Sequence, residues 1–417
     1  MQHTRSASAV ALLAVTGLVA SGCAAGDTDA AGPVELTVWT GFTGGDAVGY
    51  DQIVEDFNAS QDRIHVTMSA ESWDTIQQKL PSAWLTGEGP DIAAPSSDPN
   101  VIAQYVENGS VLPITATGDG EDEINVDDFA QALVDEFTYD GELYAVPANY
   151  ATLSLYYNKS LFEDAGIAPP TTLDELKDAA VQLTDGDIYG LALADNNTIQ
   201  MWPVLQWLEG GDIVDADECS VLDDPDVQDG LREWVDLVID EGISPVGLSG
   251  AEADDLFAAG KAAMEINGPW AAAGFEEAGV DVGIIALPAS VTGESVTLGS
   301  TVPLAISAKT QHPDEAQEFL AYWTSESTQK KFSLATGFPS LRTDLADDPE
   351  LAADEVVSVF ASQVESSRIY LPQVTNATQV DSEAYVPLIG ELTRGADIEE
   401  ATQKATETID ELTGCTS

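Results

Sequence analysis

The residues that follow position 33 alternate between strand patterns and amphipathic helix patterns, and this alternation constrains the fold more than any other feature of the chain. The stretch "VELTVWTGF" alternates apolar and polar residues as a strand does, and "YDQIVEDFNAS" has helical spacing. The strand-like "RIHVTMSA", the helical "WDTIQQKLPSAWLTG" and the strand-like "PDIAAP" continue the series. This β-α-β-α-β order predicts a parallel sheet with helices on both faces.

A second mixed unit is predicted further along the chain. The length of 417 residues is too great for one ordinary core, so two or more domains are expected. The strand-like "TLSLYYN" precedes the helix "TLDELKDAAVQLT", for which Thr172 is the expected cap. The strand and helix patterns of the two units are interrupted near residues 147–152, 298–301 and 338–345. The chain is therefore expected to cross between them three times, which allows a hinge.

The amino terminus has the pattern of an export signal. Residues 1–5 carry positive charge, residues 9–20 form a short apolar run, and "VASGC" ends at Cys23. The run is too short for a permanent membrane-spanning helix. A cysteine after small residues resembles the bacterial lipobox, in which the thiol is diacylated; the alternative is a signal peptide with a chance cysteine. We expect a signal peptide at residues 1–22 and a flexible tether at residues 23–33.

Two cysteines remain after Cys23, and they leave two readings open. Cys219 and Cys415 lie far apart in the sequence. Outside the cytoplasm such a pair can be oxidised to a disulfide that ties the carboxyl terminus to a mid-chain loop. The other reading is two unpaired buried thiols.

The charge of the chain excludes one class of partner. Fourteen Lys and Arg stand against 73 Asp and Glu, which gives a net charge of −59. A charge of this size repels phosphate backbones and anionic lipid headgroups, so nucleic-acid binding is not expected. The acidic stretch "GDGEDEINVDD" does not match the spacing of an EF-hand, so a solvated loop is expected there rather than a calcium site.

Residues for catalysis are poorly supplied. The three histidines are His3, inside the signal, His65 and His312, which disfavours a histidine triad or a His-rich metal site. No G-x-S-x-G, G-x-x-x-x-G-K-[ST] or H-E-x-x-H motif occurs. With 73 acidic residues some carboxylates will lie close together, so a secreted carbohydrate-active enzyme stays open as an alternative. No cofactor and no metal are expected.

Aromatic residues at the ends of strands and the starts of helices are the stronger signal. In "AAMEINGPWAAAG" an apolar run ends at Gly268-Pro269 and Trp270 follows at once. Sugar rings present apolar C–H faces and hydroxyl edges, which suit aromatic planes together with carboxylates; for each ring taken alone, core packing is the alternative. The candidate ligand-binding residues are Trp39, Phe42, Thr43, Asp46, Trp73, Asp98, Tyr150, Trp202, Trp270 and Asp381.

Taken in order, several motifs carry a family resemblance from about Val34 to the end. The chain resembles an extracellular solute-binding protein of an ABC importer, in the large group similar to maltose-binding protein. The motifs are "LTVWTGFTGGD", "QQKLPSAWLTGEGPDI", "GELYAVP", "LSLYYNKSLFEDAGIAPPTTLDEL", "LFAAGKAAMEINGPW", "VGIIALP", "PLAISAKTQHPDEAQEFLAYWTSESTQKKF" and "TGFPSLRTDL".

The resemblance implies an α/β, two-lobe periplasmic-binding-protein fold (type II-like) with the ligand cleft between the lobes. The lobes would be residues 34–147 with 299–342, and residues 148–298 with 343–417. It implies no enzymatic activity and a monomer, held at the outer face of the bacterial cytoplasmic membrane, that delivers a sugar to an ABC permease. A polyol, an osmolyte or a peptide is the alternative ligand.

The resemblance also implies roles for particular residues. Trp270 matches the family's cleft tryptophan, Asp98 falls where a carboxylate binds ligand hydroxyls, and Trp202 matches another ring-facing position. Two departures argue against maltose itself. Ala151 stands where maltose binders carry an acidic residue, and Asp381-Ser382-Glu383 replace aromatic residues in a cleft helix. Another monosaccharide or oligosaccharide is therefore expected.

Overall fold

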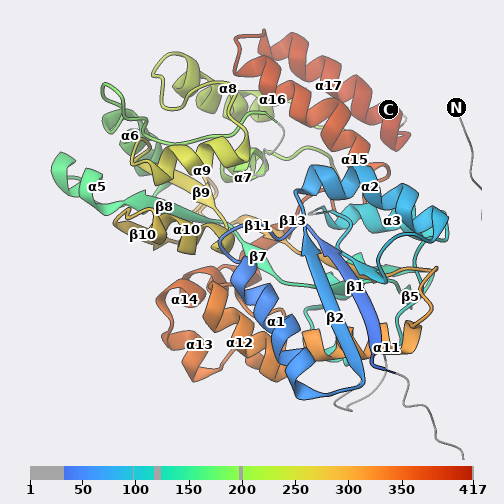
Figure 1. Ribbon diagram of the computed structural model, residues 1–417. Helices are drawn as coiled ribbons and strands as arrows, with labels where there is room; N and C mark the ends of the chain where they lie inside the picture. The colour runs from blue at the N-terminus through green and yellow to red at the C-terminus, as the bar shows by residue number, and fades with distance from the viewer. Residues whose placement is uncertain (1–31, 97, 117–123, 197–200, 416–417) are drawn as a thin grey trace, which may run out of the picture.

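The computed structural model describes residues 32–96, 98–116, 124–196 and 201–415. The predicted signal peptide and Cys23 lie outside the described residues, as do residues 118–123 of the acidic loop. The chain folds into two α/β parts that stand one above the other in Figure 1. Each part has its own core of buried hydrophobic side chains, and we call them the N-lobe and the C-lobe.

The N-lobe is built on a five-stranded sheet. Its strands are β2 (Ile64–Ala70), β1 (Val34–Thr40), β3 (Ile92–Ala93), β12 (Pro303–Ile306) and β6 (Val146–Pro147), in that order. The first three are parallel, as the sequence predicts, and β12 and β6 add two antiparallel neighbours. Strand β12 comes from a distant part of the chain, so local patterns do not reveal this pairing.

Helices cover this sheet because each carries one apolar face. Helix α1 (Ala47–Ser60) and helix α2 (Trp73–Thr86) follow β1 and β2 as predicted. Ser72 caps α2 through its side-chain oxygen, and the helix ends at Gly87 in the left-handed conformation. The N-lobe core includes Leu36, Val38, Tyr50, Trp84, Ile92, Phe319 and Trp323. The other N-lobe elements are α3 (Ile102–Glu107), α4 (Gln131–Glu136), β4 (Thr138–Tyr139), β5 (Glu142–Leu143), α11 (Pro313–Thr324) and α12 (Glu326–Thr336).

The C-lobe has a smaller, antiparallel sheet. Strand β8 (Ser154–Asn158) lies between β10 (Val282–Ile285) and β9 (Met264–Asn267). The strand-like "YGLALAD" forms two isolated parallel bridges, in which Tyr189 pairs with Ala262 and Ala192 with Glu265. It therefore extends this sheet without becoming a regular strand.

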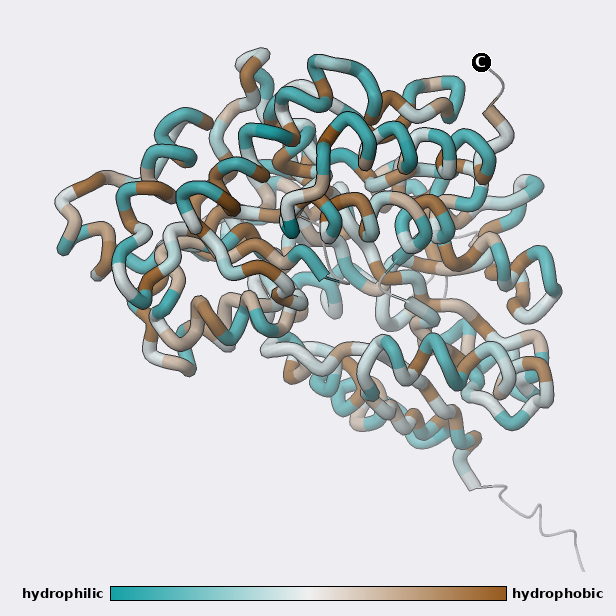
Figure 2. Tube along the Cα trace, turned by 90° about the horizontal axis from the view of Figure 1, so that it is seen from above, coloured by the Kyte–Doolittle hydropathy of each residue, from teal (hydrophilic) through white to brown (hydrophobic). Residues whose placement is uncertain are grey.

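The helices of the C-lobe surround that sheet, and their polar and apolar residues alternate along the outer helices in Figure 2. The cap predicted at Thr172 is confirmed, because Thr172 and Glu175 form a reciprocal capping box at helix α6. The C-lobe helices are α5 (Lys159–Ala165), α6 (Leu173–Gln182), α7 (Met201–Leu208), α8 (Pro225–Ile239), α9 (Gly250–Ala258), α10 (Ala272–Glu277), α15 (Ala377–Gln379), the π-helix η6 (Val380–Tyr385), α16 (Val386–Leu392) and α17 (Ile398–Thr413). Within the described part of the chain, no helix is long and apolar enough to cross a bilayer.

A third small sheet lies where the two lobes meet (Figure 1). Strand β11 (Thr297–Ser300) pairs with β7 (Ala151–Thr152) on one side and with β13 (Ser367–Ile369) on the other. Strands β7 and β11 fall in two of the predicted crossings. In the third, residues 338–345, Phe338 belongs to the N-lobe core and Leu345 to a separate small cluster beside α13 (Pro349–Ala353) and α14 (Glu355–Ala361).

The two remaining cysteines form a disulfide. Cys219 and Cys415 are joined with their Cα atoms 5.3 Å apart, and 196 positions separate them in the sequence. The bond ties the segment after α17 to the loop before α8, so the reading of two free thiols is wrong.

Candidate functional site

The carboxyl ends of the parallel strands β1, β2 and β3 lie toward the C-lobe, and the candidate residues follow these ends. Phe42 and Asp46 come after β1, Trp73 begins the helix after β2, and Asp98 comes after β3. In an open α/β sheet, the loops beyond the carboxyl ends of parallel strands share one edge and form ligand sites. The topology therefore gathers residues that are up to 56 positions apart, from Phe42 to Asp98, at one edge of one sheet.

Trp270 lies between the two lobes. It sits in a short 3-10 turn, Pro269–Ala271, directly after β9. Among the described residues, it is the one partly buried hydrophobic side chain that packs against both cores. Its ring centre is 6.3 Å from that of Phe338 in the N-lobe. The ring is thus held from both sides while part of it stays accessible.

Two glycines make this position of Trp270 sterically feasible. A Cβ atom at Gly268 would come within 2.2 Å of the indole ring, so the ring folds back over a backbone without a side chain. A Cβ atom at Gly45 would come within 3.2 Å of the Trp270 carbonyl oxygen. The loop after β1 therefore approaches the C-lobe closely at this point.

The aromatic residues after β1 and β2 form one stacked group. Phe42 is 5% exposed and stacks on Tyr50, with ring centres 3.7 Å apart, and the Trp73 ring meets Phe42 edge-on at 5.7 Å. Trp39 and Trp73 are partly buried against the N-lobe core, whereas Thr43 is exposed. Phe42 is therefore part of the N-lobe core, whereas Trp73 and Thr43 keep accessible surface.

Asp46 is buried behind this aromatic group and is connected to the segments between the lobes. Burial raises the pKa of Asp46 to about 6, against hydrogen bonds from its own backbone and from Tyr50 that lower it. The side chain of Asn149 donates a hydrogen bond of 2.5 Å to the Tyr50 hydroxyl and accepts one of 3.2 Å from the Val302 N–H. A polar chain thus runs from the loop after β1 to the interlobe connections.

Asp98 bonds across the lobe boundary. Its Oδ1 accepts hydrogen bonds of 3.0 Å from the backbone and side-chain nitrogens of Asn100, and its Oδ2 accepts one of 3.2 Å from the Thr378 hydroxyl in the C-lobe. Burial raises its pKa in spite of these three bonds. On the C-lobe side, Asp381 accepts a 2.8 Å bond from the Tyr370 hydroxyl. Burial raises the pKa of Asp381 to about 6, and the negative charge of Asp98 adds to the effect.

Glu136 is a candidate residue that sequence reasoning missed. It is the last residue of α4 and is 3% exposed, and its side chain has no hydrogen bond or ion pair with any other described residue. Burial raises its pKa to about 7, and Asp98 raises it further. Burial raises the pKa of Tyr139, and the negative charges of Glu136 and Asp98 raise it further. The stretch "VDEFTYDG" contains no pattern that separates Glu136 from the exposed Asp135.

We expect the mutation Glu136→Gln to change how stability depends on pH. A raised carboxyl pKa means that the folded chain binds more protons than the unfolded chain between about pH 4.5 and 7, so stability falls as the pH rises through this range. Glutamine cannot ionise and does not incur this loss. Thermal melting of the variant should therefore match wild type at pH 5 and occur several degrees higher at pH 8. If the melting temperatures of the variant and wild type differed by the same amount at pH 5 and pH 8, the burial of an ionised Glu136 would be contradicted.

Tyr150 joins the two lobes but is largely enclosed. It is 7% exposed, and its hydroxyl lies 2.5 Å from that of Ser367 at the start of β13. Burial raises its pKa, and the bond with Ser367 lowers it. Tyr150 is therefore placed to support the small interlobe sheet.

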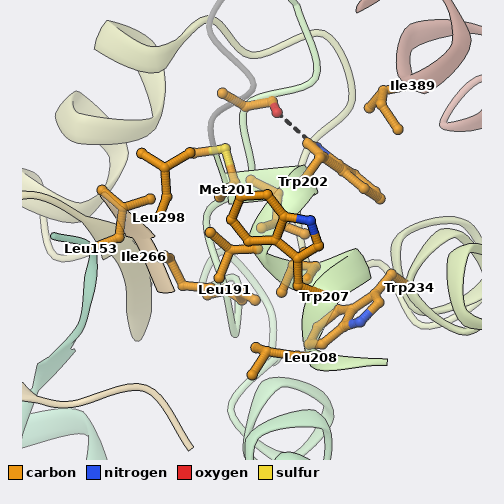
Figure 3. Close-up of a cluster of buried hydrophobic side chains, with 14 of the residues drawn as sticks. Leu153, Leu191, Met201, Trp202, Trp207, Leu208, Trp234, Ile266, Leu298 and Ile389 are labelled. Carbon is orange, nitrogen blue, oxygen red and sulfur yellow. Dashed lines mark hydrogen bonds between the residues drawn. The ribbon is translucent and has the colours of Figure 1, made fainter. Parts of the chain in front are cut away.

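Trp202 is a correction to the sequence-based expectation. Its side chain is 0% exposed in the C-lobe core, and its indole N–H donates a 2.9 Å hydrogen bond to the Ala194 carbonyl, drawn in Figure 3. Figure 3 draws the ring together with Ile389 and Trp207, which belong to the same core. The ring presents no face to a ligand in this structure, so we assign Trp202 to the core. Its position at a helix start resembles that of Trp270, and the sequence cannot distinguish the two.

The site combines aromatic surface, hydroxyl groups and carboxyl groups from both lobes. This chemistry suits hydrogen bonding to a polyhydroxylated molecule whose apolar faces stack on rings. Among the residues that the structure describes, no group of three or more His, Cys, Asp or Glu side chains has the arrangement of a metal site.

Comparison with known proteins identifies a family. The sequence profile of the family described as "Bacterial extracellular solute-binding protein" matches residues 52–358. The chain is 25% identical to the maltotriose-binding protein of Pyrococcus abyssi over 348 residues, which cover 80% of this chain and 72% of the relative.

Solved structures of the same kind share the fold. The GacH receptor of Streptomyces glaucescens, solved unliganded and with acarbose, has a TM-score of 0.82 at 23% identity and covers 92% of this chain and 100% of its own. UgpB from Mycobacterium tuberculosis, solved with glycerophosphocholine, has a TM-score of 0.78 at 18% identity. The match covers 92% of this chain and 98% of UgpB. The predicted periplasmic-binding-protein fold is confirmed, and so is the expectation of a solute-binding protein without enzymatic activity.

Proposed function

This chain belongs to the bacterial extracellular solute-binding proteins, and on that basis we propose that it captures a sugar between its lobes and delivers it to the permease of an ABC transporter. An oligosaccharide is the first candidate. The observation that carries the proposal is Trp270, a partly accessible ring held between both cores and approached by the loop after β1. The maltotriose-binding relative from Pyrococcus abyssi supports a sugar ligand.

A non-sugar ligand is the second candidate, because UgpB, with the same fold, was solved with glycerophosphocholine. Isothermal titration of the mature chain against mono-, di- and trisaccharides, polyols, osmolytes, short peptides and glycerophosphocholine tests both. Micromolar or tighter binding of a sugar supports the proposal. Binding of a non-sugar alone would replace it with the second candidate.

We further propose that ligand binding closes the lobes about the segments near β7 and β11. A ligand that touches Asp98 from one lobe and Trp270 from the other favours the closed form, since only that form makes both contacts. Moving the lobes from 1:99 to 99:1 closed requires a preference of about 5.5 kcal/mol. Small-angle scattering should show the radius of gyration decreasing when ligand is added. Tight binding without any compaction would contradict this mechanism.

The mutation Asp98→Asn should weaken sugar binding by about ten- to hundredfold, which corresponds to losing a charged hydrogen bond of about 1.5–3 kcal/mol. Asparagine keeps the shape and removes the charge that ligand hydroxyls would meet. Titration calorimetry measures the change. Asp62→Asn is the matched control, because Asp62 is exposed at the opposite, amino end of β2. Equal affinity of the Asp98 variant and wild type would remove Asp98 from the site.

We also propose that the mature protein is a monomer anchored through a diacylated Cys23 at the outer face of the cytoplasmic membrane, with lobes of residues 34–147 plus 299–342 and 148–298 plus 343–417. The motif "VASGC" and family membership support the anchor. Two acyl chains hold a protein firmly at a bilayer, whereas one binds weakly. Mass spectrometry of the native protein should find an acylated Cys23 as the first residue.

A further inference from the structure

We propose that Asp98, Glu136 and Asp381, which we call the acidic cluster, make this site select a sugar or cyclitol that carries a basic amine. The inference rests on the proposed function and names the ligand class within it. The ammonium group of such a ligand would pair with Glu136. A neutral sugar of the same size would bind more weakly.

The acidic cluster spans the boundary between the lobes. Asp98 and Glu136 belong to the N-lobe and Asp381 to the C-lobe. The Thr378 hydroxyl bonds to Asp98 across this boundary, and the Gln373 side chain donates a 2.9 Å bond to the carbonyl of Asp135, next to Glu136. A group bound at the cluster therefore contacts both lobes, as a ligand that drives closure must.

Glu136 differs from the other members in having no donor. Asp98 accepts from Asn100 and Thr378, and Asp381 accepts from Tyr370. Asp195, a carboxylate of the C-lobe that is 2% exposed, also has donors: it accepts from the Gly247 N–H at 2.6 Å and from the Thr393 hydroxyl at 2.5 Å. A nearly buried carboxyl without a donor is costly. A ligand that brings a donor to Glu136 removes that cost.

Among the described residues, the ionisable groups coupled to the acidic cluster carry no positive charge. They are acidic or phenolic, namely the cluster itself with Tyr139, Tyr370 and Tyr385. No ion pair between described residues includes a member of the cluster. Hydroxyl groups of a neutral sugar can donate hydrogen bonds here but leave the like charges unbalanced. An ammonium group donates hydrogen bonds and also balances the negative charge, because it is a donor that carries a positive charge.

Sugar pairs with and without basic amines test the proposal. The probes are glucosamine with glucose, which differ in one amine, and the β-1,4-linked glucosamine disaccharide with cellobiose, which differ in two; N-acetylglucosamine has the nitrogen without the charge. Calorimetry uses the mature wild-type chain at pH 7.5. In each pair that binds, the amine should bind at least about tenfold more tightly, as a desolvated charge pair does, and N-acetylglucosamine should behave like glucose.

Variants then assign the preference to Glu136. Glu136→Gln should bind the amine and its neutral partner about equally, whereas Asp135→Asn should keep the wild-type preference. Asp135 is the matched control because it is the adjacent residue, exposed on α4, and its removal changes the net charge by the same amount. If Glu136→Gln fails to fold, as judged by circular dichroism, Asp381→Asn makes the same test from the other lobe.

The results separate this inference from the proposed function. Equal affinity for both members of every pair would overturn the amine preference and leave sugar binding intact. A preference that persists in Glu136→Gln and in Asp381→Asn would overturn the role of the acidic cluster. If none of these probes binds while another neutral sugar of the wider panel does, the amine preference is overturned and the proposed function stands.

Discussion

Replacing Trp270 with alanine should weaken sugar binding by about 2–4 kcal/mol, or about 30- to 700-fold in Kd. The ring packs against both cores and keeps part of its surface accessible, so it offers a stacking face that exists only when both lobes are in place. The ring also lies directly over Gly268, which fixes its orientation before ligand arrives. Titration calorimetry with the sugar identified from the panel measures the loss.

Trp202→Phe is the matched control for this experiment. Trp202 is fully buried and its N–H is bonded to the Ala194 carbonyl, so phenylalanine removes a core hydrogen bond without touching the proposed site. This variant should melt at a lower temperature and bind sugar with wild-type affinity. Trp270→Ala should instead weaken sugar binding strongly and lower the melting temperature little. Unchanged affinity of Trp270→Ala together with a large loss of stability would assign Trp270 to the core.

Removing the disulfide by the double mutation Cys219→Ser, Cys415→Ser should lower the free energy of unfolding by about 2–5 kcal/mol. The bond closes a loop of 196 positions, and a loop of this length restricts the unfolded chain strongly. The expected result is an earlier midpoint of urea unfolding. A reducing agent should shift wild type by a similar amount and leave the double variant unchanged.

The disulfide should affect binding less than stability. Neighbours of the two cysteines hold the loop that leads to Thr378: Glu218 accepts a 2.8 Å bond from the Thr375 N–H, and the Leu412 carbonyl accepts one of 2.7 Å from the Asn376 side chain. These bonds remain in the double variant. At temperatures where it is folded, its Kd should stay within about threefold of wild type. An unchanged unfolding midpoint would show that the bond does not stabilise the folded chain.

Much of the fold was predictable because its signals are local. The alternation of strands and helices after position 33 predicted the parallel arrangement of β1, β2 and β3 with α1 and α2 between them, and Thr172 was recognised as a cap. These features depend on which face of an element is apolar and on which backbone groups need partners at a helix end. Residues close together in the sequence determine both the apolar face and the cap.

The candidate site was predictable in part for the same reason. Strand ends locate the loops that carry Phe42, Asp46, Trp73 and Asp98, because the carboxyl ends of parallel strands share an edge. Trp202 and Trp270 follow the same local signature, yet one is in the C-lobe core and the other lies between the lobes. A local pattern states that a ring will be buried and does not state against which part of the chain.

The sequence by itself determined the α/β class, the first three strands with their helices, and the family. Tertiary structure alone decided that β12 and β6 complete the N-lobe sheet, that Cys219 meets Cys415, and that Glu136 is enclosed beside Asp98 without a donor. These outcomes depend on contacts between residues far apart in the chain. Local periodicity fixes the face that each element buries, whereas packing between distant elements fixes what that face, or a single charged side chain, will meet.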